Sequence, residues 1–325
     1  MTDMTTAAGT NSTAARPTRA FRGLKALALG LTALALGIAG TTAPATAAPL
    51  ILTGGSFTGD SLADLVKKEG DSFRIWQNTD GDDRVWPWGS TGKVHGSGWS
   101  GVDASKVYFA KLTNDRYKDL VLLDGDSFRV WTHNGTATFG ANPWTVPPFR
   151  TGGGWSGHDP SAIWFADIDG NGQDDLIQRS GDVLQYFRNL GEGKSWAAPV
   201  TIGYGYSGHN PRAIWFADLN GDQRAERIER FGDQFMVAPN TTGGGGGWPY
   251  GTVYFTGSGW SGQDPAAIWF ADITGDNRAD LVQKSGDALR YYPNNGSGSG
   301  YTNWAAGVGA GTGWSAVDPK GIYFA

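Results

Sequence analysis

Residues 163–176 read IWFADIDGNGQDDL, and this stretch decides the fold. Its first four residues are mostly β-branched or aromatic, and they predict a short buried strand. Oxygen-bearing side chains follow at alternate places, Asp167, Asp169 and Asn171, before a second β-rich segment begins at Asp175. The local pattern is therefore a strand, a tight acidic loop and another strand.

This pattern recurs five times. A Gly-aromatic-Ser phrase places its aromatic residue at Trp99, Trp155, Tyr206, Trp260 and Trp314, with spacings of 56, 51, 54 and 54 residues. A predicted strand follows each phrase, at Val107–Ala110, Ile163–Ala166, Ile214–Ala217, Ile268–Ala271 and Ile322–Ala325. Self-similarity at about 50 residues is typical of propeller blades.

Each unit continues with a second strand, such as Asp280–Gln283, and a Gly-Asp turn suited to a two-residue hairpin that needs positive φ. The turns are Gly70-Asp71, Gly125-Asp126, Gly181-Asp182, Gly232-Asp233 and Gly286-Asp287. A third strand such as Phe73–Trp76 returns, and a looser fourth segment carries Trp86, Trp144, Trp196, Trp248 or Trp304. These units predict an all-β protein, a β-propeller of about five four-stranded antiparallel blades in one domain, residues 48–325. A β-solenoid and a partial or oligomer-completed seven-bladed propeller are the alternatives.

The two ends of the repeat region compete for one place. Leu52–Gly55 and Ile322–Ala325 have the same repeat phase, so only one of them can complete a blade in a five-bladed ring. The sequence leaves open which segment closes the ring.

Residues 1–47 predict a secretory signal peptide. Arg16, Arg19, Arg22 and Lys25 precede an apolar run that is short for a membrane span, and Ala45-Thr46-Ala47 supplies a small-residue cleavage signal. Its removal takes away four basic residues and one acidic residue, which changes the formal charge from −5 to −8. We expect a Sec-type signal of bacterial appearance, a secreted acidic protein, no membrane insertion and no nucleic-acid partner.

Three acidic loops carry oxygen ligands at positions one, three, five and nine, with a backbone carbonyl available at position seven. In order, the sets are Asp167, Asp169, Asn171, Gln173 and Asp175; Asp218, Asn220, Asp222, Arg224 and Glu226; and Asp272, Thr274, Asp276, Arg278 and Asp280. Converging oxygens are what calcium prefers, so we expect about three Ca²⁺ sites. The alternative is that these side chains only cap turns.

The loops, in register with the strands before them, resemble FG-GAP repeats, also called VCBS repeats. The phrases that carry the resemblance are residues 165–172, 216–222 and 270–276, and it extends over essentially residues 50–325. The resemblance implies an integrin-type calcium-binding propeller used for adhesion or ligand binding, including lectin-like secreted bacterial members. That family more often has seven blades.

Two loops depart from the pattern. Ser56, Thr58, Asp60 and Asp64 offer weaker ligands, with Asp60 and Asp64 as a possible weak site. Lys111 opens the loop of Thr113, Asp115 and Asp119, and its ammonium group can neutralise Asp115 and Asp119 in place of a metal. We expect no calcium in that loop.

The sequence contains no catalytic constellation that we recognise, and we expect a protein that is not an enzyme; a secreted lyase or hydrolase is the alternative. The candidate ligand-binding residues lie in the Gly-aromatic-Ser loops: Trp155, His158 and Asp159; Tyr206, His209 and Asn210; and Trp260, Gln263 and Asp264. An aromatic face beside polar groups suits a sugar ring. The competing interpretation gives the aromatics an inter-blade packing role and the Asp-Pro pairs a turn role.

The function expected from these observations is a calcium-stabilised, lectin-like or adhesion-like binding module for a glycan or another cell-surface ligand. A structural propeller that binds a protein partner is a further alternative. The sequence has no Cys, so disulfides cannot stabilise the loops, and we expect calcium to stabilise them instead. We expect a monomer.

Overall fold

A computed structural model describes residues 55–79, 87–89, 91–136, 142–145, 147–241, 249–296 and 302–325. The chain divides into two units, Met1–Ala48 and Pro49–Ala325, and the first lies wholly outside the described residues together with the predicted signal peptide. Within the described part, no helix is long and apolar enough to cross a membrane.

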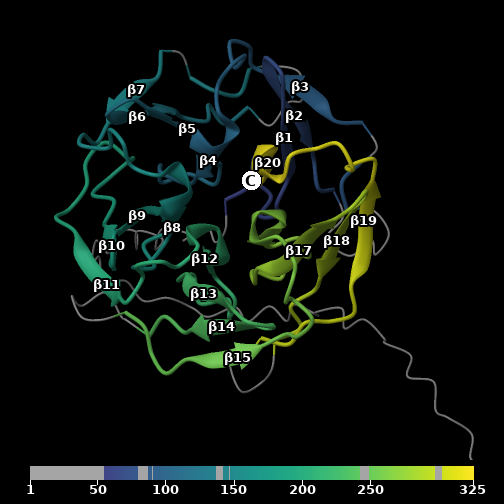
Figure 1. Cartoon of the computed structure of the whole chain (residues 1–325). Helices are drawn as coiled ribbons and strands as arrows, with labels where there is room; N and C mark the ends of the chain where they lie inside the picture. The colour runs from purple at the N-terminus through teal and green to yellow at the C-terminus, as the bar shows by residue number, and fades with distance from the viewer. Residues whose placement is uncertain are drawn as a thin grey trace, which may run out of the picture. The chain divides into compact units, whose positions relative to one another are not determined.

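Twenty strands form five four-stranded antiparallel sheets in the described residues, which confirms the predicted five blades (Figure 1). The first blade contains β20 (Ile322–Phe324), β1 (Leu65–Glu69), β2 (Ser72–Trp76) and β3 (Lys93–His95). The second contains β4 (Val107–Ala110), β5 (Asp119–Asp124), β6 (Ser127–Trp131) and β7 (Phe149–Thr151). The third contains β8 (Ile163–Ala166), β9 (Asp175–Ser180), β10 (Val183–Phe187) and β11 (Val200–Tyr204). The fourth contains β12 (Ile214–Ala217), β13 (Glu226–Phe231), β14 (Gln234–Ala238) and β15 (Tyr254–Thr256). The fifth contains β16 (Ile268–Ala271), β17 (Asp280–Ser285), β18 (Ala288–Tyr292) and β19 (Val308–Thr312).

Short 3₁₀ helices precede the innermost strands and close a ring. They are η1 (Ala104–Lys106), η2 (Pro160–Ala162), η3 (Pro211–Ala213), η4 (Pro265–Ala267) and η5 (Pro319–Gly321). Each contacts the next, and η5 contacts η1. The strands β4, β8 and β12 therefore lie around one axis, as Figure 1 shows.

The C-terminal strand completes the first blade. β20 pairs with β1 in antiparallel register, with Val66 opposite Tyr323. Asp64 N donates to Ala325 O at 2.6 Å, and Ala325 N donates to Asp64 O at 2.9 Å. The competing segment lies outside the described residues except for Gly55, which is packed against the Lys111 side chain. The structure thus answers the question that the sequence left open.

The hydrophobic core is divided among the interfaces between blades. Each cluster of buried side chains joins neighbouring blades; the cluster around Trp99 contains Phe73 and Ile75 from the first blade and Leu120 from the second. Both faces of each sheet are covered in this way, which accounts for the high content of aromatic residues.

The Gly-Asp turns do more than reverse the chain. Gly125 has a φ of +67°, as the hairpin prediction requires. Asp126 then accepts hydrogen bonds from Gly154 N at 2.9 Å and from Ser156 N at 3.1 Å. The equivalent Asp residues of the other four turns accept the same pair of amides. Each hairpin therefore fixes the Gly-aromatic-Ser loop of its own blade.

Isolated β-bridges lie in the looser fourth segment of each blade. Trp144, Trp196 and Trp304 each form one. In the first and fourth blades the bridging residues are Trp88 and Tyr250. The residues predicted there, Trp86 and Trp248, lie outside the described residues.

Candidate functional site

The acidic loops join the innermost strand to the second strand in the second to fifth blades, and the equivalent loop leads into β1 in the first blade. In every loop except the second, the first-position side chain accepts a hydrogen bond from the backbone N three residues later. In the third blade, Asp167 accepts hydrogen bonds from Gly170 N and Gly172 N, both at 2.7 Å. In the first blade, Ser56 Oγ accepts one from Gly59 N at 2.8 Å. A hydroxyl therefore folds the loop as well as a carboxylate does, so capping of turns explains the loop shape but not the excess of carboxylates.

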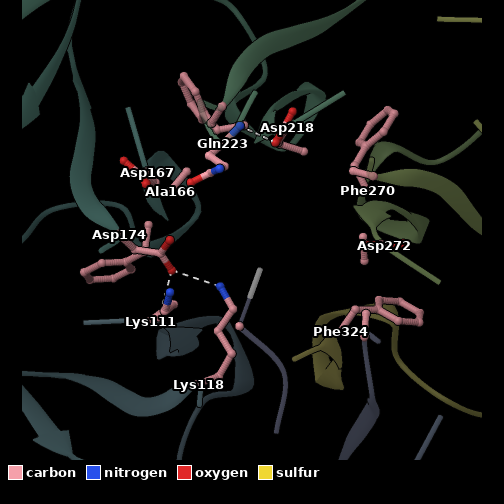
Figure 2. A pocket seen from close by; sticks show the side chains of 18 of the residues that line it. Lys111, Lys118, Ala166, Asp167, Asp174, Asp218, Gln223, Phe270, Asp272 and Phe324 are labelled. Carbon is pink, nitrogen blue, oxygen red and sulfur yellow. Dashed lines mark hydrogen bonds and ion pairs between the residues drawn. The ribbon is translucent and has the colours of Figure 1, made fainter. Parts of the chain in front are cut away.

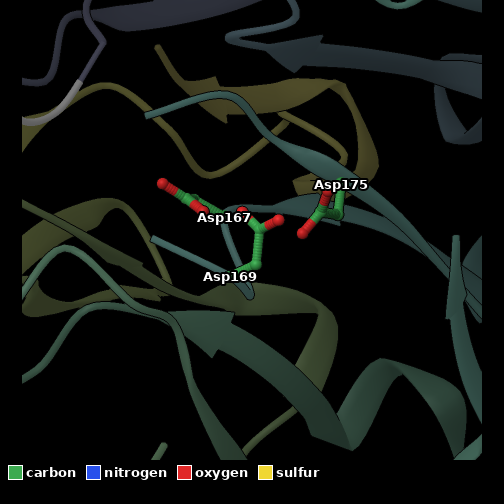
Figure 3. Close-up of side chains that lie close together, drawn as sticks. All are labelled: Asp167, Asp169 and Asp175. Carbon is green, nitrogen blue, oxygen red and sulfur yellow. The ribbon is translucent and has the colours of Figure 1, made fainter. Parts of the chain in front are cut away.

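The third-blade loop brings three carboxylates together. One oxygen from each of Asp167, Asp169 and Asp175 lies within 4.8 Å of the others. Figure 3 shows the carboxylates of Asp169 and Asp175 facing one another. Asn171 lies in the same loop, where its Oδ1 accepts a hydrogen bond from Gln173 N at 2.8 Å. This arrangement has the oxygen donors and the spacing that a divalent cation requires.

Burial disfavours the ionised forms of the carboxylates in this cluster. Desolvation raises the pKa of Asp167 to about 7, and neighbouring carboxylates contribute in the same direction. Desolvation also raises the pKa of Asp175 to about 8, against the opposing effect of a hydrogen bond from Asn189 N. The neighbouring cation, Lys118, pairs with Asp174 at 3.0 Å instead. A bound cation would lower these pKa values because it stabilises the ionised forms.

In the fourth and fifth loops, an Arg side chain neutralises part of the carboxylate charge. Arg224 Nη1 lies 4.0 Å from Asp222 Oδ2, and Arg278 forms an ion pair with Asp276. The side chains of the seventh-position residues therefore neutralise the fifth-position carboxylates.

Other ligand oxygens of these two loops accept hydrogen bonds, from a side chain in one case and from backbone amides, as in the third loop, in the others. In the fourth loop, Asn220 Nδ2 donates to Glu226 Oε1 at 2.9 Å. In the fifth loop, Asp280 accepts from Thr274 N at 3.0 Å, and Asp272 accepts from Gly275 N at 2.6 Å. Asp218 accepts likewise from Gly221 N, at 2.6 Å. Among the His, Asp and Glu side chains of the described residues, only those of the third loop form a group of three within reach of one ion.

The first and second loops close without a cluster of carboxylates. Thr58 N donates to Asp64 at 2.8 Å, and Ser56 Oγ donates to Asp60 at 3.1 Å. In the second loop, Asp119 accepts from Leu112 N at 3.2 Å. Burial raises the pKa of Asp119 to about 7.

The carboxylate with the largest effect on the pKa of Lys111 is Asp174, and not one of the two expected from the sequence. The backbone N of Lys111 donates to Asp174 Oδ2 at 2.7 Å. Burial lowers the pKa of the Lys111 ammonium group, and the largest opposing effect comes from Asp174. Asp115, one of the two partners expected from the sequence, also acts on Lys111, but more weakly.

The aromatic residues of the Gly-aromatic-Ser loops lie between blades. Trp155, Tyr206 and Trp260 are only 6%, 4% and 6% exposed. The Trp155 ring lies 5.0 Å from Phe128 of its own blade and 5.8 Å from Phe187 of the next, measured between ring centroids. The packing role therefore accounts for these rings, and they offer little surface for stacking on a sugar.

The polar partners of these loops have local structural roles. Asp159 caps η2 by accepting from Ser161 N at 2.9 Å; Asn210 and Asp264 cap η3 and η4 in the same way. His158 Nδ1 lies 2.8 Å from Gln178 Nε2. Gln263 Oε1 accepts from Gln283 Nε2, also at 2.8 Å.

Replacement of Asp159, which caps η2, distinguishes a capping role from a ligand-binding role. We expect Asp159→Ala to lower the free energy of unfolding by about 1 kcal/mol, because the amide of Ser161 loses its acceptor. Urea denaturation measures the change, and Asp159→Ser, which keeps a capping oxygen, is the control. Lost ligand binding with unchanged stability would instead support a ligand role.

A cleft of about 800 Å³ lies between the first and second blades. Trp99, Trp131 and Trp144 line it, and the Trp99 and Trp131 ring centroids are 5.2 Å apart. Its polar groups include Asn142 and the ion pair of Asp124 with Arg129. This cleft belongs to the first Gly-aromatic-Ser loop, which the sequence argument placed outside the candidate ligand sites.

A second cavity, of about 290 Å³, lies beside the third such loop and includes His209 and Asn210. Its wall contains Glu229, which accepts from Tyr206 Oη at 2.9 Å and pairs with Arg227 Nε at 2.8 Å. Two of the nine candidate ligand residues therefore line a cavity. The buried Arg227–Glu229 pair distinguishes this interface from the others.

The central channel is lined by aromatic side chains that the sequence interpretation treated as ordinary strand residues. A cavity of about 230 Å³ is bounded by Tyr108, Trp164, Trp215, Trp269 and Tyr323, one from each blade. Each ring meets a Phe of a neighbouring blade, as Trp164 meets Phe216 at 5.5 Å between ring centroids. The signal was present in the sequence, because the innermost strand of a blade faces the axis with alternate residues.

One mouth of the channel is charged and breaks the five-fold repeat. This cavity, of about 210 Å³, is lined by Asp167, Asp218 and Asp272 together with Lys111, Lys118 and Asp174. Figure 2 shows the backbone N of Lys111 and the ammonium group of Lys118 both donating to Asp174 at one side of the mouth. Asp174 and Lys118 were not among the residues that the sequence singled out, because they lie at loop positions that do not repeat.

Known proteins show similarity at the level of the repeat and the fold. FG-GAP-like repeats match the chain in two places, residues 111–178 and 167–228. A lectin from Agrocybe aegerita that recognises non-reducing terminal N-acetylglucosamine is 22% identical, with a TM-score of 0.45, over 76% of this chain and 63% of the lectin. The Photorhabdus luminescens Tc holotoxin pore is 21% identical, with a TM-score of 0.45, over 75% of this chain and 11% of the toxin chain. This chain thus spans less than two thirds of either structure. No curated protein matches the sequence.

Proposed function

We propose that this chain, whose FG-GAP-like repeats build a five-bladed propeller, is a lectin-like module that binds a glycan in the cleft between its first and second blades. The observation that carries the proposal is the combination of tryptophan walls and a polar rim in one cavity of about 800 Å³. A sugar ring needs both features, because its C–H face stacks on an aromatic ring while its hydroxyls need hydrogen-bond partners.

Trp131 is the stacking residue in this proposal. It is half-buried, whereas Trp99 and Trp144 are 6% and 4% exposed and form the floor. The Arg129 guanidinium lies 5.7 Å from the centroid of the Trp131 ring and pairs with Asp124, so the polar rim is held close to this ring. Polar groups that are fixed in advance cost little ordering entropy when a ligand binds.

A glycan array with the secreted part of the chain tests this function, and it should include N-acetylglucosamine-terminated glycans among others. We expect Trp131→Ala to weaken binding roughly tenfold or more, since about 1.4 kcal/mol of lost contact is one factor of ten. Phe187→Ala is the matched control: Phe187 contacts Trp155 at 5.8 Å, as Trp131 contacts Trp99 at 5.2 Å, at an interface lined by different residues. If no glycan on the array binds, or if both variants lose binding equally, the glycan proposal is wrong and a protein partner is favoured instead.

Export and calcium binding belong to the same proposal. We propose a secreted monomer in which Asp167, Asp169, Asn171 and Asp175, with the Gln173 carbonyl, hold Ca²⁺ as a structural ion. The support is the signal-like N-terminal sequence, the close grouping of three carboxylates and the absence of Cys. The fourth and fifth loops are weaker candidates because Arg224 and Arg278 already neutralise part of their charge.

A second candidate function, a secreted lyase or hydrolase, is tied to the mouth of the channel. There Lys118 and Asp174 break the repeat within a cavity of about 210 Å³. Lys118→Met would abolish a hydrolytic or eliminating activity centred on this mouth and leave glycan binding in the cleft unchanged. Assays of the two variants, Lys118→Met and Trp131→Ala, against the same glycans separate the two functions.

A further inference from the structure

The loop that follows β6 carries an Asn-Gly pair whose surroundings differ from every equivalent place in the described blades. Asn134 and Gly135 are exposed, and Gly135 has a φ of +76°. Gly135 N donates to His133 Nδ1 at 3.1 Å. The other four blades have Asn in place of His133, at Asn78, Asn189, Asn240 and Asn294.

Two aromatic contacts and one backbone hydrogen bond hold His133 in position. Tyr117 stacks on it with ring centroids 4.4 Å apart and an interplanar angle of 9°, and Phe57 meets its edge at 5.2 Å. The backbone N of His133 donates to Asp119 at 2.8 Å. Because Nδ1 accepts an N–H bond, the neutral ring carries its proton on Nε2. Burial lowers the pKa of His133 to about 4, so the Nδ1 lone pair is free of a proton at neutral pH.

The hydrogen bonds of the Asn134 side chain activate its carbonyl carbon for attack by a nucleophile. Its Oδ1 accepts from Thr136 N at 3.0 Å and also from the Thr136 hydroxyl. Its Nδ2 donates to Asn142 O at 3.0 Å. Two donors on the carbonyl oxygen stabilise the negative charge that develops when the carbon is attacked.

We propose that Asn134–Gly135 is a self-modification site, at which the chain deamidates with His133 as an internal base and Thr136 as an oxyanion donor. Gly135 N attacks Asn134 Cγ, and its proton passes to His133 Nδ1. The bond between Cγ and Nδ2 then breaks, and ammonia leaves with that proton. Water opens the resulting succinimide at either carbonyl, which gives aspartate or isoaspartate at this position.

The modification has a direct path to the cleft between the first and second blades. Replacement of the amide removes the donor to Asn142 O and sets a carboxylate against that carbonyl. Asn142 lines the cleft, and its Oδ1 accepts from Trp144 N at 3.3 Å. The reaction would therefore alter the rim of the cavity once, irreversibly, with the age of the protein. The chemistry itself does not depend on the proposed glycan function.

Peptide mapping by mass spectrometry after incubation of the whole secreted chain at neutral pH tests the proposal. We expect the peptide containing Asn134 to gain the mass of amide-to-acid exchange faster than the peptide containing Asn295. Asn295–Gly296 is the internal control, because Asn295 is exposed and Gly296 N donates to an amide oxygen, Asn294 Oδ1, at 3.1 Å. Isoaspartate, detected by its distinct retention time, should accompany the aspartate product.

Two variants assign the roles. His133→Asn installs the residue that the other blades already have. We expect it to slow the reaction roughly tenfold, less than the roughly 10²–10⁴-fold that a positioned base typically supplies, because burial makes His133 a weak base. Thr136→Val removes only the hydroxyl donor and should slow it less. Equal rates at Asn134 and Asn295, or an unchanged rate in His133→Asn, would overturn the proposal. Melting curves of both variants confirm that each rate is measured on the folded chain.

Discussion

Removal of Ile322–Ala325 is expected to abolish cooperative folding of the propeller. Ile322 and Ala325 are 2% and 1% exposed, and Phe324 lies 5.5 Å from Trp88 and 5.4 Å from Trp269, measured between ring centroids. Full burial of each large side chain contributes about 1.5–3 kcal/mol, so the lost strand removes several kcal/mol. A domain has only about 5–15 kcal/mol of net stability. Thermal unfolding followed by near-UV circular dichroism measures the loss.

A point variant separates closure of the ring from a local contact in the same strand. Tyr323 Oη donates to Ala104 O at 2.7 Å, and Tyr323→Phe deletes only this hydrogen bond, at a cost of about 1 kcal/mol. We expect this variant to unfold cooperatively at a slightly lower temperature. If the truncated chain kept its melting temperature, another segment would have to fill the inner position beside β1, as the equivalent phase of Leu52–Gly55 allows.

The fold was predictable because its signals are local and repeated. The strand Ile163–Ala166 begins and ends where the sequence predicted it, and so does Ile268–Ala271. Hydrophobic runs and Gly-Asp turns act within a few residues, and repetition removes chance matches. The ring closure was not predictable, since two segments of equal phase differ only in which partner they meet.

The roles of the repeated aromatics required the structure. A Trp in a Gly-rich loop has the same sequence signature whether it fills an interface or presents a face to a ligand, and only burial decides between them. Trp155, a candidate ligand residue, is 6% exposed. Trp131, which the sequence did not place in any candidate site, lies half-buried in a cleft. Its neighbour in the cleft, Trp99, belongs to a different blade, and such contacts have no spacing that a sequence reveals.

The acidic loops show the same limit for metal sites. Asp and Asn at alternate positions serve both turn capping and calcium binding, because both uses need oxygens on one side of a tight loop. The structure separates the loops by what occupies each oxygen. Asn220 donates to Glu226 in the fourth loop, whereas three carboxylates converge in the third.

Calcium is expected to stabilise the propeller, and more strongly at pH 8 than at pH 5. Folding raises the pKa of Asp167 and Asp175 from 3.8 to about 7 and about 8, so the folded chain binds more protons than the unfolded chain between these limits. Without metal, stability should therefore fall as the pH rises from about 4 to about 8. Calcium at about 100 times its dissociation constant adds about 2.7 kcal/mol, because it binds only the folded state. That corresponds to a rise in melting temperature of roughly 5–10 °C, measured by calorimetry with calcium and with EGTA.

Two matched variants locate the effect in the third loop. Asp169→Asn places there the residue that the fourth loop already has at the same position, so the turn is preserved while one ligand charge is lost. We expect it to remove most of the calcium-dependent shift. Asp115→Asn makes the same chemical change in the second loop, at its fifth position, where Lys111 takes the first position, and should leave the shift intact. Equal melting temperatures with calcium and with EGTA would show that the acidic loops are turn caps. A full shift retained in Asp169→Asn would move the ion to the fourth or fifth loop, where Arg224 or Arg278 would then have to release its carboxylate.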